Sequence, residues 1–150
     1  MDGGNVLIEL ESAAQILLGP PNLVAQEQRQ QAEQIFLNFR KTKSPYQMCK
    51  QLLEQSKNNY VLFEASGLLK EGIIREWHEL SSNDTAQLRS YLLQYVVNNP
   101  LLSAYVRERI VQVIAIMVKR RSVEDGGEDR AVVINEVQQL ITGSKYFSPF

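Results

Sequence analysis

Residues 105–122 read YVRERIVQVIAIMVKRRS, and this stretch decides between an all-helical and a mixed fold. Its centre, residues 110–118, is rich in β-branched side chains that would also suit a buried strand. Charged triplets flank that centre, and its apolar stripe recurs at helical spacing. The stripe consists of Val106, Ile110, Val113, Ile114 and Met117. We therefore expect a helix that is buried on most sides, with a buried strand as the alternative.

Helical periodicity extends outward from this stretch through nearly the whole chain, and turn signals interrupt it at regular intervals. Asn22 is expected to cap the second helix, and Ser44 the third, in a capping box closed by Gln47. The cluster at 81–84 predicts the cap of the fifth helix, and the acidic stretch at 124–129 predicts a loop. The predicted helices span about 5–18, 22–41, 45–56, 60–77, 84–98, 100–121 and 129–142.

The helices pair into repeats of about 40 residues, a period with two helices per unit that is typical of HEAT repeats. A single hairpin cannot bury its own apolar stripe, so the hairpins must stack, and their second helices then line a concave wall. We therefore predict an all-α, HEAT-type α-solenoid of about three and a half hairpins. The predicted parts are a domain at 1–142 with hairpins at 5–41, 45–77 and 84–121 and a half repeat at 129–142, then an irregular tail at 143–150.

The composition excludes several classes of function. The 150 residues carry 16 Lys and Arg against 17 Asp and Glu, so no chain-wide positive field exists to hold a nucleic acid. The single cysteine and single histidine exclude a disulfide framework and a paired-histidine metal site. The motifs GxxxxGKS/T, GxGxxG and HExxH are absent, so we expect no enzyme and no cofactor. Without a signal peptide or a long apolar run, we expect a soluble intracellular protein that does not insert into membranes.

Three features that could carry chemistry have simpler structural explanations. Cys49 lies at a helical position that predicts packing rather than reactivity. His78 is expected to be a favourable cation near a helix C-terminus. The triplet Lys119-Arg120-Arg121 could form a basic import patch, but a helix end near Arg121 favours interactions with the last carbonyl groups of that helix.

Side chains turned away from the apolar stripes are the candidates for binding a partner. In a solenoid they line one wall, either as a merely solvated surface or as a binding site. Phe63 and Ile74 favour a contact role, with a partner or with neighbouring repeats, because exposing apolar side chains to water gains nothing. The outward side chains are Gln30, Gln34 and Lys41 in the second helix, Phe63, Lys70 and Ile74 in the fourth, and Glu108, Gln112, Ala115 and Lys119 in the sixth.

Three stretches resemble the importin-β/exportin family of nuclear transport receptors. Residues 27–45, EQRQQAEQIFLNFRKTKSP, resemble that family's first HEAT repeat, in which a polar helix carries an Ala-Glu pair before its apolar stripe. Residues 68–77, LLKEGIIREW, are similar to the second-repeat signature of Leu-Lys, an aliphatic pair and a closing Trp. Together with residues 105–122, the resemblance covers about residues 1–142.

The resemblance implies a nuclear export receptor that shuttles between nucleus and cytoplasm through nuclear pores. In such receptors the inner helices of the first repeats bind the GTP form of the small GTPase Ran, whose switch regions depend on the nucleotide. The resemblance also implies contacts with nucleoporins, and with export cargo such as a hypusinated translation factor through a longer arch.

The resemblance assigns roles to two positions. Lys70 matches the lysine of the Leu-Lys motif and is the first candidate for a charged contact with Ran. Trp77 matches the closing aromatic residue, and we assign it to packing. The other Ran-facing candidates rest on wheel geometry alone, and they are Gln30, Gln34, Lys41, Gln112 and Lys119.

The end of the chain departs from the family pattern. Residues 143–150, GSKYFSPF, do not resemble the next hairpin, which suggests a fragment, a splice product or a truncated gene product. Cargo binding through the missing arch should then be weak or absent. The alternative function is that of a helical-repeat adaptor or scaffold that binds peptides without a GTPase.

Overall fold

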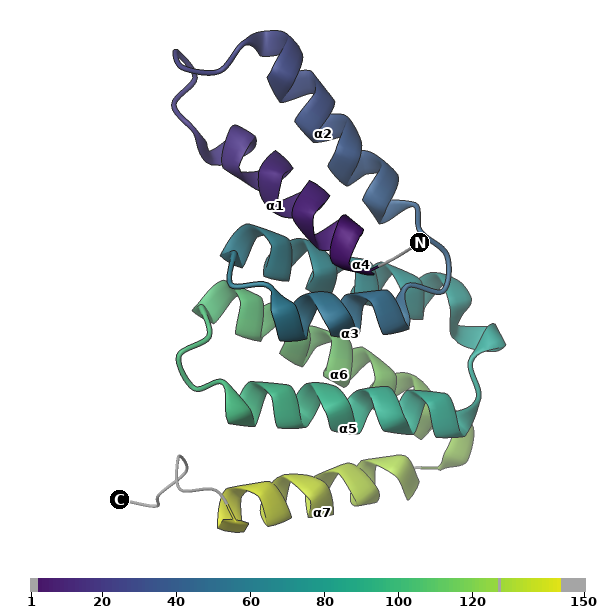
Figure 1. Ribbon diagram of the computed structural model, residues 1–150. Coiled ribbons are helices and arrows are strands. Elements are labelled where there is room, and N and C mark those ends of the chain that lie inside the picture. The colour runs from purple at the N-terminus through teal and green to yellow at the C-terminus, as the bar shows by residue number, and fades with distance from the viewer. Residues whose placement is uncertain (1–2, 127, 144–150) are drawn as a thin grey trace. The chain divides into compact units, whose positions relative to one another are not determined.

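The computed structural model describes residues 3–126 and 128–143, and every regular element within these ranges is a helix. This confirms the predicted all-α, HEAT-type fold class. The strand considered for residues 110–118 is wrong, because this stretch lies inside a long helix. Of the irregular tail predicted at 143–150, Gly143 belongs to the last helix and the rest lies outside the described residues. The helices are α1 (Gly3–Leu18), α2 (Gln26–Arg40), α3 (Tyr46–Gln55), α4 (Asn59–Glu76), the 3₁₀ helix η1 (Trp77–Glu79), α5 (Ser82–Asn98), α6 (Ala104–Asp125) and α7 (Glu128–Gly143), as Figure 1 shows.

The chain forms two compact units, residues 1–75 and 76–150, and each is described by itself. In the first unit α1 and α2 form an antiparallel hairpin, and α1 also packs against α3 (Figure 1). The end of α4 lies against the start of α3, because a Cβ added at Gly72 would meet Pro45 Cγ at 3.1 Å and the Tyr46 hydroxyl at 3.3 Å. This glycine therefore allows the two helices to approach closely.

The core of the first unit is built from the predicted apolar stripes. Cys49 is fully buried within it, and this burial raises the pKa of its thiol, so the predicted packing role is confirmed. Ile35 of α2 is only half-buried. The large side chains that are fully buried here are Leu10, Phe36, Leu52, Val61, Leu68, Leu69 and Ile73.

In the second unit α6 packs against both α5 and α7, and α5 also contacts α7. The predicted cap of α5 is confirmed, because the Ser81 hydroxyl accepts a hydrogen bond from the Asp84 amide at 3.0 Å. The buried Arg89 of α5 forms an ion pair with Glu136 of α7 at 3.1 Å. The large side chains that are fully buried in this unit are Leu92, Val106, Ile110, Val113 and Met117.

Two predicted helix caps are wrong. Helix α2 begins at Gln26 rather than after Asn22, because Leu23 donates its amide hydrogen to the carbonyl oxygen of Pro20 at 3.0 Å and closes a turn there. Ser44 has a φ of 45°, in the left-handed region, and it does not cap α3. The N-cap of α3 is Pro45, whose carbonyl accepts the first helical hydrogen bond, from the Cys49 amide at 2.9 Å.

The loop predicted at 124–129 is also wrong for most of its length. Helix α6 continues to Asp125, and α7 begins at Glu128. The helix ends at Gly126, which adopts a φ of 71°, the left-handed conformation that glycine takes without a steric cost. The basic triplet Lys119-Arg120-Arg121 therefore does not lie in the last turn of α6, and its predicted interaction with the carbonyl end of that helix is wrong.

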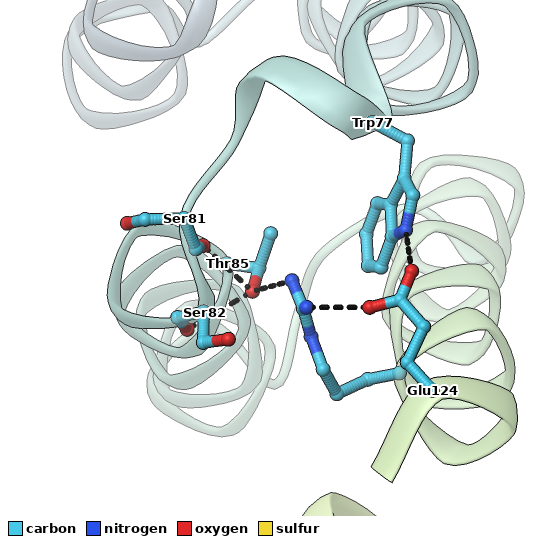
Figure 2. Close-up of polar contacts among 6 residues, drawn as sticks. Trp77, Ser81, Ser82, Thr85 and Glu124 are labelled. Carbon is cyan, nitrogen blue, oxygen red and sulfur yellow. Dashed lines mark hydrogen bonds and ion pairs between the residues drawn. The ribbon is translucent and has the colours of Figure 1, made fainter.

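Arg121 instead joins three elements of the second unit (Figure 2). Its guanidinium donates to Glu124 Oε2 at 2.7 Å and to the Thr85 hydroxyl of α5 at 2.9 Å. The indole nitrogen of Trp77 donates to Glu124 Oε1 at 2.6 Å. Arg121 Cζ lies 4.7 Å from the centroid of the Trp77 ring, which is a cation–π distance. Trp77 is only 4% exposed, so its assignment to packing is confirmed.

We predict that Phe36→Ala lowers the free energy of unfolding by about 3–5 kcal/mol, because the ring is 1% exposed and its removal leaves a cavity. Thermal denaturation followed by circular dichroism measures the loss. Leu37→Ala is the matched control. Leu37 follows Phe36 in α2 but is 45% exposed, so its truncation should cost less stability. A midpoint lowered by less than about 2 °C in Phe36→Ala would contradict the core assignment.

We predict that Arg121→Ala lowers the free energy of unfolding by about 1–3 kcal/mol, because Thr85 and Glu124 each lose a hydrogen bond and the buried Trp77 ring loses its cation. Urea denaturation measures this change. Lys119→Ala removes an exposed cation from the same helix and is expected to change stability by less than about 0.5 kcal/mol. Equal midpoints for the two variants would show that the Arg121 contacts do not stabilise the unit.

Candidate functional site

The predicted partner-binding residues fall into one group in each unit. In the first unit Gln30, Gln34 and Lys41 are exposed at α2, and Lys70 of α4 is half-buried. In the second unit Gln112 and Lys119 are exposed on α6.

Two contacts fix how α2 lies against α4. The rings of Phe36 and Tyr60 pack edge to face with their centroids 5.0 Å apart. One turn further along both helices, the Arg40 guanidinium donates to the two carboxylate oxygens of Glu64 at 2.9 and 2.7 Å. Both contacts join residues that are 24 positions apart in the sequence. Helices α2 and α4 therefore run in the same direction past each other at these turns, inclined to one another (Figure 1).

This register separates the candidates of the first unit. With an offset of 24, Lys70 lies level with position 46, which is five residues beyond Lys41. The two lysines are therefore separated by about 8 Å along the helix axis. Gln30 lies about 24 Å from Lys70 along the same direction. Gln34, which donates to the Asn38 amide oxygen at 3.0 Å, is also far from Lys70. The structure therefore groups Lys41 with Lys70 and does not bring Gln30 and Gln34 to them.

Around these two lysines lies a surface that we call the α2–α4 face. On a helical wheel both helices turn its members away from their buried stripes, and the Arg40–Glu64 ion pair crosses its middle. It combines apolar side chains with cations. The face consists of Leu37 and Arg40 of α2, of Lys41, which directly follows α2, and of Phe63, Glu64 and Lys70 of α4.

The ion pair at the middle of the face is asymmetric in exposure. The Arg40 side chain is 46% exposed, whereas the Glu64 side chain is 13% exposed. The hydrogen bonds to Glu64 raise the pKa of Arg40, so the guanidinium stays charged. Burial and the nearby Glu64 carboxylate raise the pKa of Tyr60, and the cation of Arg40 opposes that effect. At the end of the seam, by which we mean the line of contact between α2 and α4, the Arg75 guanidinium donates to the Thr42 carbonyl oxygen at 3.0 Å.

Sequence reasoning did not find Leu37, Arg40 or Glu64. All three lie on two helices that were predicted correctly, but the contact between the helices depends on their register. No local pattern encodes an offset of 24 residues between two charges. The opposite charges of Arg40 and Glu64 were a usable signal only after the two helices had been placed side by side.

The candidates of the second unit form a simpler surface. Gln112 and Lys119 lie on the same exposed side of α6, two turns and about 10 Å apart. Glu108 and Ala115 complete this row, and both are exposed as predicted. The row is polar, with one cation and one carboxylate.

A pocket of about 110 Å³ lies between α1, α2 and the start of α3, and its walls are mainly apolar. Across residues 3–126 and 128–143, no group of three or more His, Cys, Asp or Glu side chains could hold a metal ion. In the same ranges, none of the helices combines the length and apolar character needed to cross a membrane.

Comparison with known proteins identifies relatives over most of the chain. A sequence model of the family described as Exportin-4 matches residues 9–146. Exportin-4 of Dictyostelium discoideum is 32% identical over 71 residues, which cover 47% of this chain and 6% of that protein. Exportin-7-A and Exportin-7-B of Xenopus laevis are each 26% identical over 91 residues, or 61% of this chain and 8% of those proteins. The chain thus spans less than a tenth of the length of these relatives.

Proposed function

Because the chain belongs to the exportin-4 family, we propose that it is part of a nuclear export receptor and binds the GTP form of the small GTPase Ran. The match to the family over residues 9–146 carries this proposal. The fold supports it, since a stack of helical hairpins presents broad surfaces for another protein.

The α2–α4 face is the proposed contact surface in the first unit. Lys41 and Lys70 supply two cations that can pair with acidic side chains on the GTPase, and Leu37 supplies exposed apolar surface one helical turn before Lys41. Gln112 and Lys119 remain proposed contacts from the second unit, and Gln30 and Gln34 are proposed as peripheral contacts on α2. Dependence on GTP would follow because the γ-phosphate orders the switch segments of a small GTPase.

The remaining proposals concern the whole receptor. Binding of Ran and of cargo is expected to be reciprocal, so that each raises the affinity for the other and hydrolysis of GTP releases both. A hypusinated translation factor is the proposed cargo, nucleoporins are further partners, and the receptor would shuttle between nucleus and cytoplasm. These activities require the length that the relatives have and this chain does not span.

The second candidate function is that of a helical-repeat adaptor. The exposed apolar side chains Leu37 and Ile74 favour it, because they could bind an amphipathic peptide without regard to a nucleotide. The dependence on the nucleotide separates the two functions.

We predict that the immobilised chain retains Ran loaded with a non-hydrolysable GTP analogue and does not retain Ran loaded with GDP. A pull-down with equal amounts of the two forms measures this difference. Equal retention of both forms, or retention of neither, would remove the proposed GTPase contact.

We predict that Lys70→Glu weakens binding of GTP-loaded Ran by about 1 kcal/mol or more, because it replaces a cation of the α2–α4 face by a carboxylate. Calorimetry measures the dissociation constant, and circular dichroism checks that helicity is unchanged. Lys57→Glu is the matched control, since it makes the same charge change at an exposed position between α3 and α4. An unchanged affinity in Lys70→Glu would place this lysine outside the contact.

A further inference from the structure

The contact between Arg40 and Glu64 has a geometry that few other contacts between helices provide. Two donor nitrogens, Nε and Nη2, reach the two oxygens of one carboxylate at 2.9 and 2.7 Å. Such a paired arrangement holds only when the guanidinium and the carboxylate are level and nearly coplanar. A shift of α2 along α4 by a fraction of a turn would break at least one of the two bonds.

Apolar packing along the same seam specifies the register less sharply. The contact between Phe36 and Tyr60 gains from burial, which has no preferred direction along the helix axis. A slip of one helical turn, about 5.4 Å, would let side chains interdigitate again. It would, however, leave the mostly buried Glu64 carboxylate without its cation, which is costly. The ion pair therefore discriminates between registers that apolar packing tolerates.

The place of the pair in the sequence gives the register a functional consequence. Arg40 directly precedes Lys41, and Glu64 lies six residues before Lys70. Once Arg40 and Glu64 are level, the spacing between the two lysines of the α2–α4 face follows from helix geometry. The two lysines come from different hairpins, so no local feature of either helix sets that spacing.

We propose that Arg40 and Glu64 are positioning residues that set the register of α2 against α4, and through it the spacing of Lys41 and Lys70 on the binding face. The assignment of this face to a GTPase rests on the proposed function. The setting of the register does not, and it is tested separately.

The first experiment measures the register directly, without any partner. Nitroxide labels on Glu27→Cys of α2 and Glu71→Cys of α4 are exposed, lie outside the seam and should be about 30 Å apart along the axis. Cys49 is buried and should not take up label. Pulsed electron paramagnetic resonance on the labelled chain, with Arg40 and Glu64 unchanged, should give one narrow distribution of label-to-label distances.

Charge reversal then tests the pair. Arg40→Glu places two carboxylates against each other and should broaden the distribution or move its mean by about 5 Å. The double variant Arg40→Glu/Glu64→Arg should restore the narrow distribution, and Lys57→Glu should leave it unchanged. Arg40→Lys keeps the charge without the paired hydrogen bonds, and it serves as the test if the reversal unfolds the chain. An unaltered distribution in both Arg40 variants would overturn the proposal.

The second experiment asks whether Arg40 acts through the lysines or touches the partner. Arg40→Glu should weaken binding of GTP-loaded Ran by about tenfold, and the double variant should recover to within about threefold of the parent. A direct contact with Ran would not be recovered by moving the cation to position 64, and that result would overturn the positioning role. If the parent chain does not bind Ran, the proposed function fails, and the label distances still decide whether the pair sets the register.

Discussion

The structure depends on one constraint, which is that a helical hairpin cannot bury its own apolar stripe. In the first unit the stripe of α2 is covered by α1 on one side and reaches α4 through Phe36 on the other. The same requirement closes the second unit, where α6 packs against both α5 and α7. Every hairpin therefore needs a neighbour. As a result, a surface formed by outward side chains combines residues from more than one hairpin, as the α2–α4 face does.

The sequence predicts the parts of this protein that are local. Helical periodicity identifies the seven α-helices among the described residues, and the cluster at 81–84 marks the cap of α5. The failures arise where other interactions override the cap and loop signals, as the turn closed between Pro20 and Leu23 does before α2. Ser44 resembles a cap but takes a left-handed conformation, and the acidic segment after Arg121 remains helical because Glu124 binds Trp77 and Arg121.

The candidate site shows where such reasoning ends. A helical wheel turns Lys41 and Lys70 away from the buried stripes, because a wheel requires only the period of one helix, and the structure leaves Lys41 exposed and Lys70 half-buried. It gave no information on which lysine lies near which, because that depends on how two helices slide past each other. Arginine illustrates the same limit, since Arg40 crosses an exposed face whereas Arg121, with a side chain 13% exposed, holds a buried junction.

The environment of Trp77 has a consequence for spectroscopy. This residue is the only tryptophan among the 150 residues, and it belongs to the second compact unit. Its indole is hydrogen-bonded to the Glu124 carboxylate and lies against the guanidinium of Arg121. The wavelength and intensity of its fluorescence emission should therefore change when these contacts are lost. Fluorescence therefore reports on one half of the chain while far-ultraviolet ellipticity reports on both. A difference between the two melting curves would reveal halves that unfold independently.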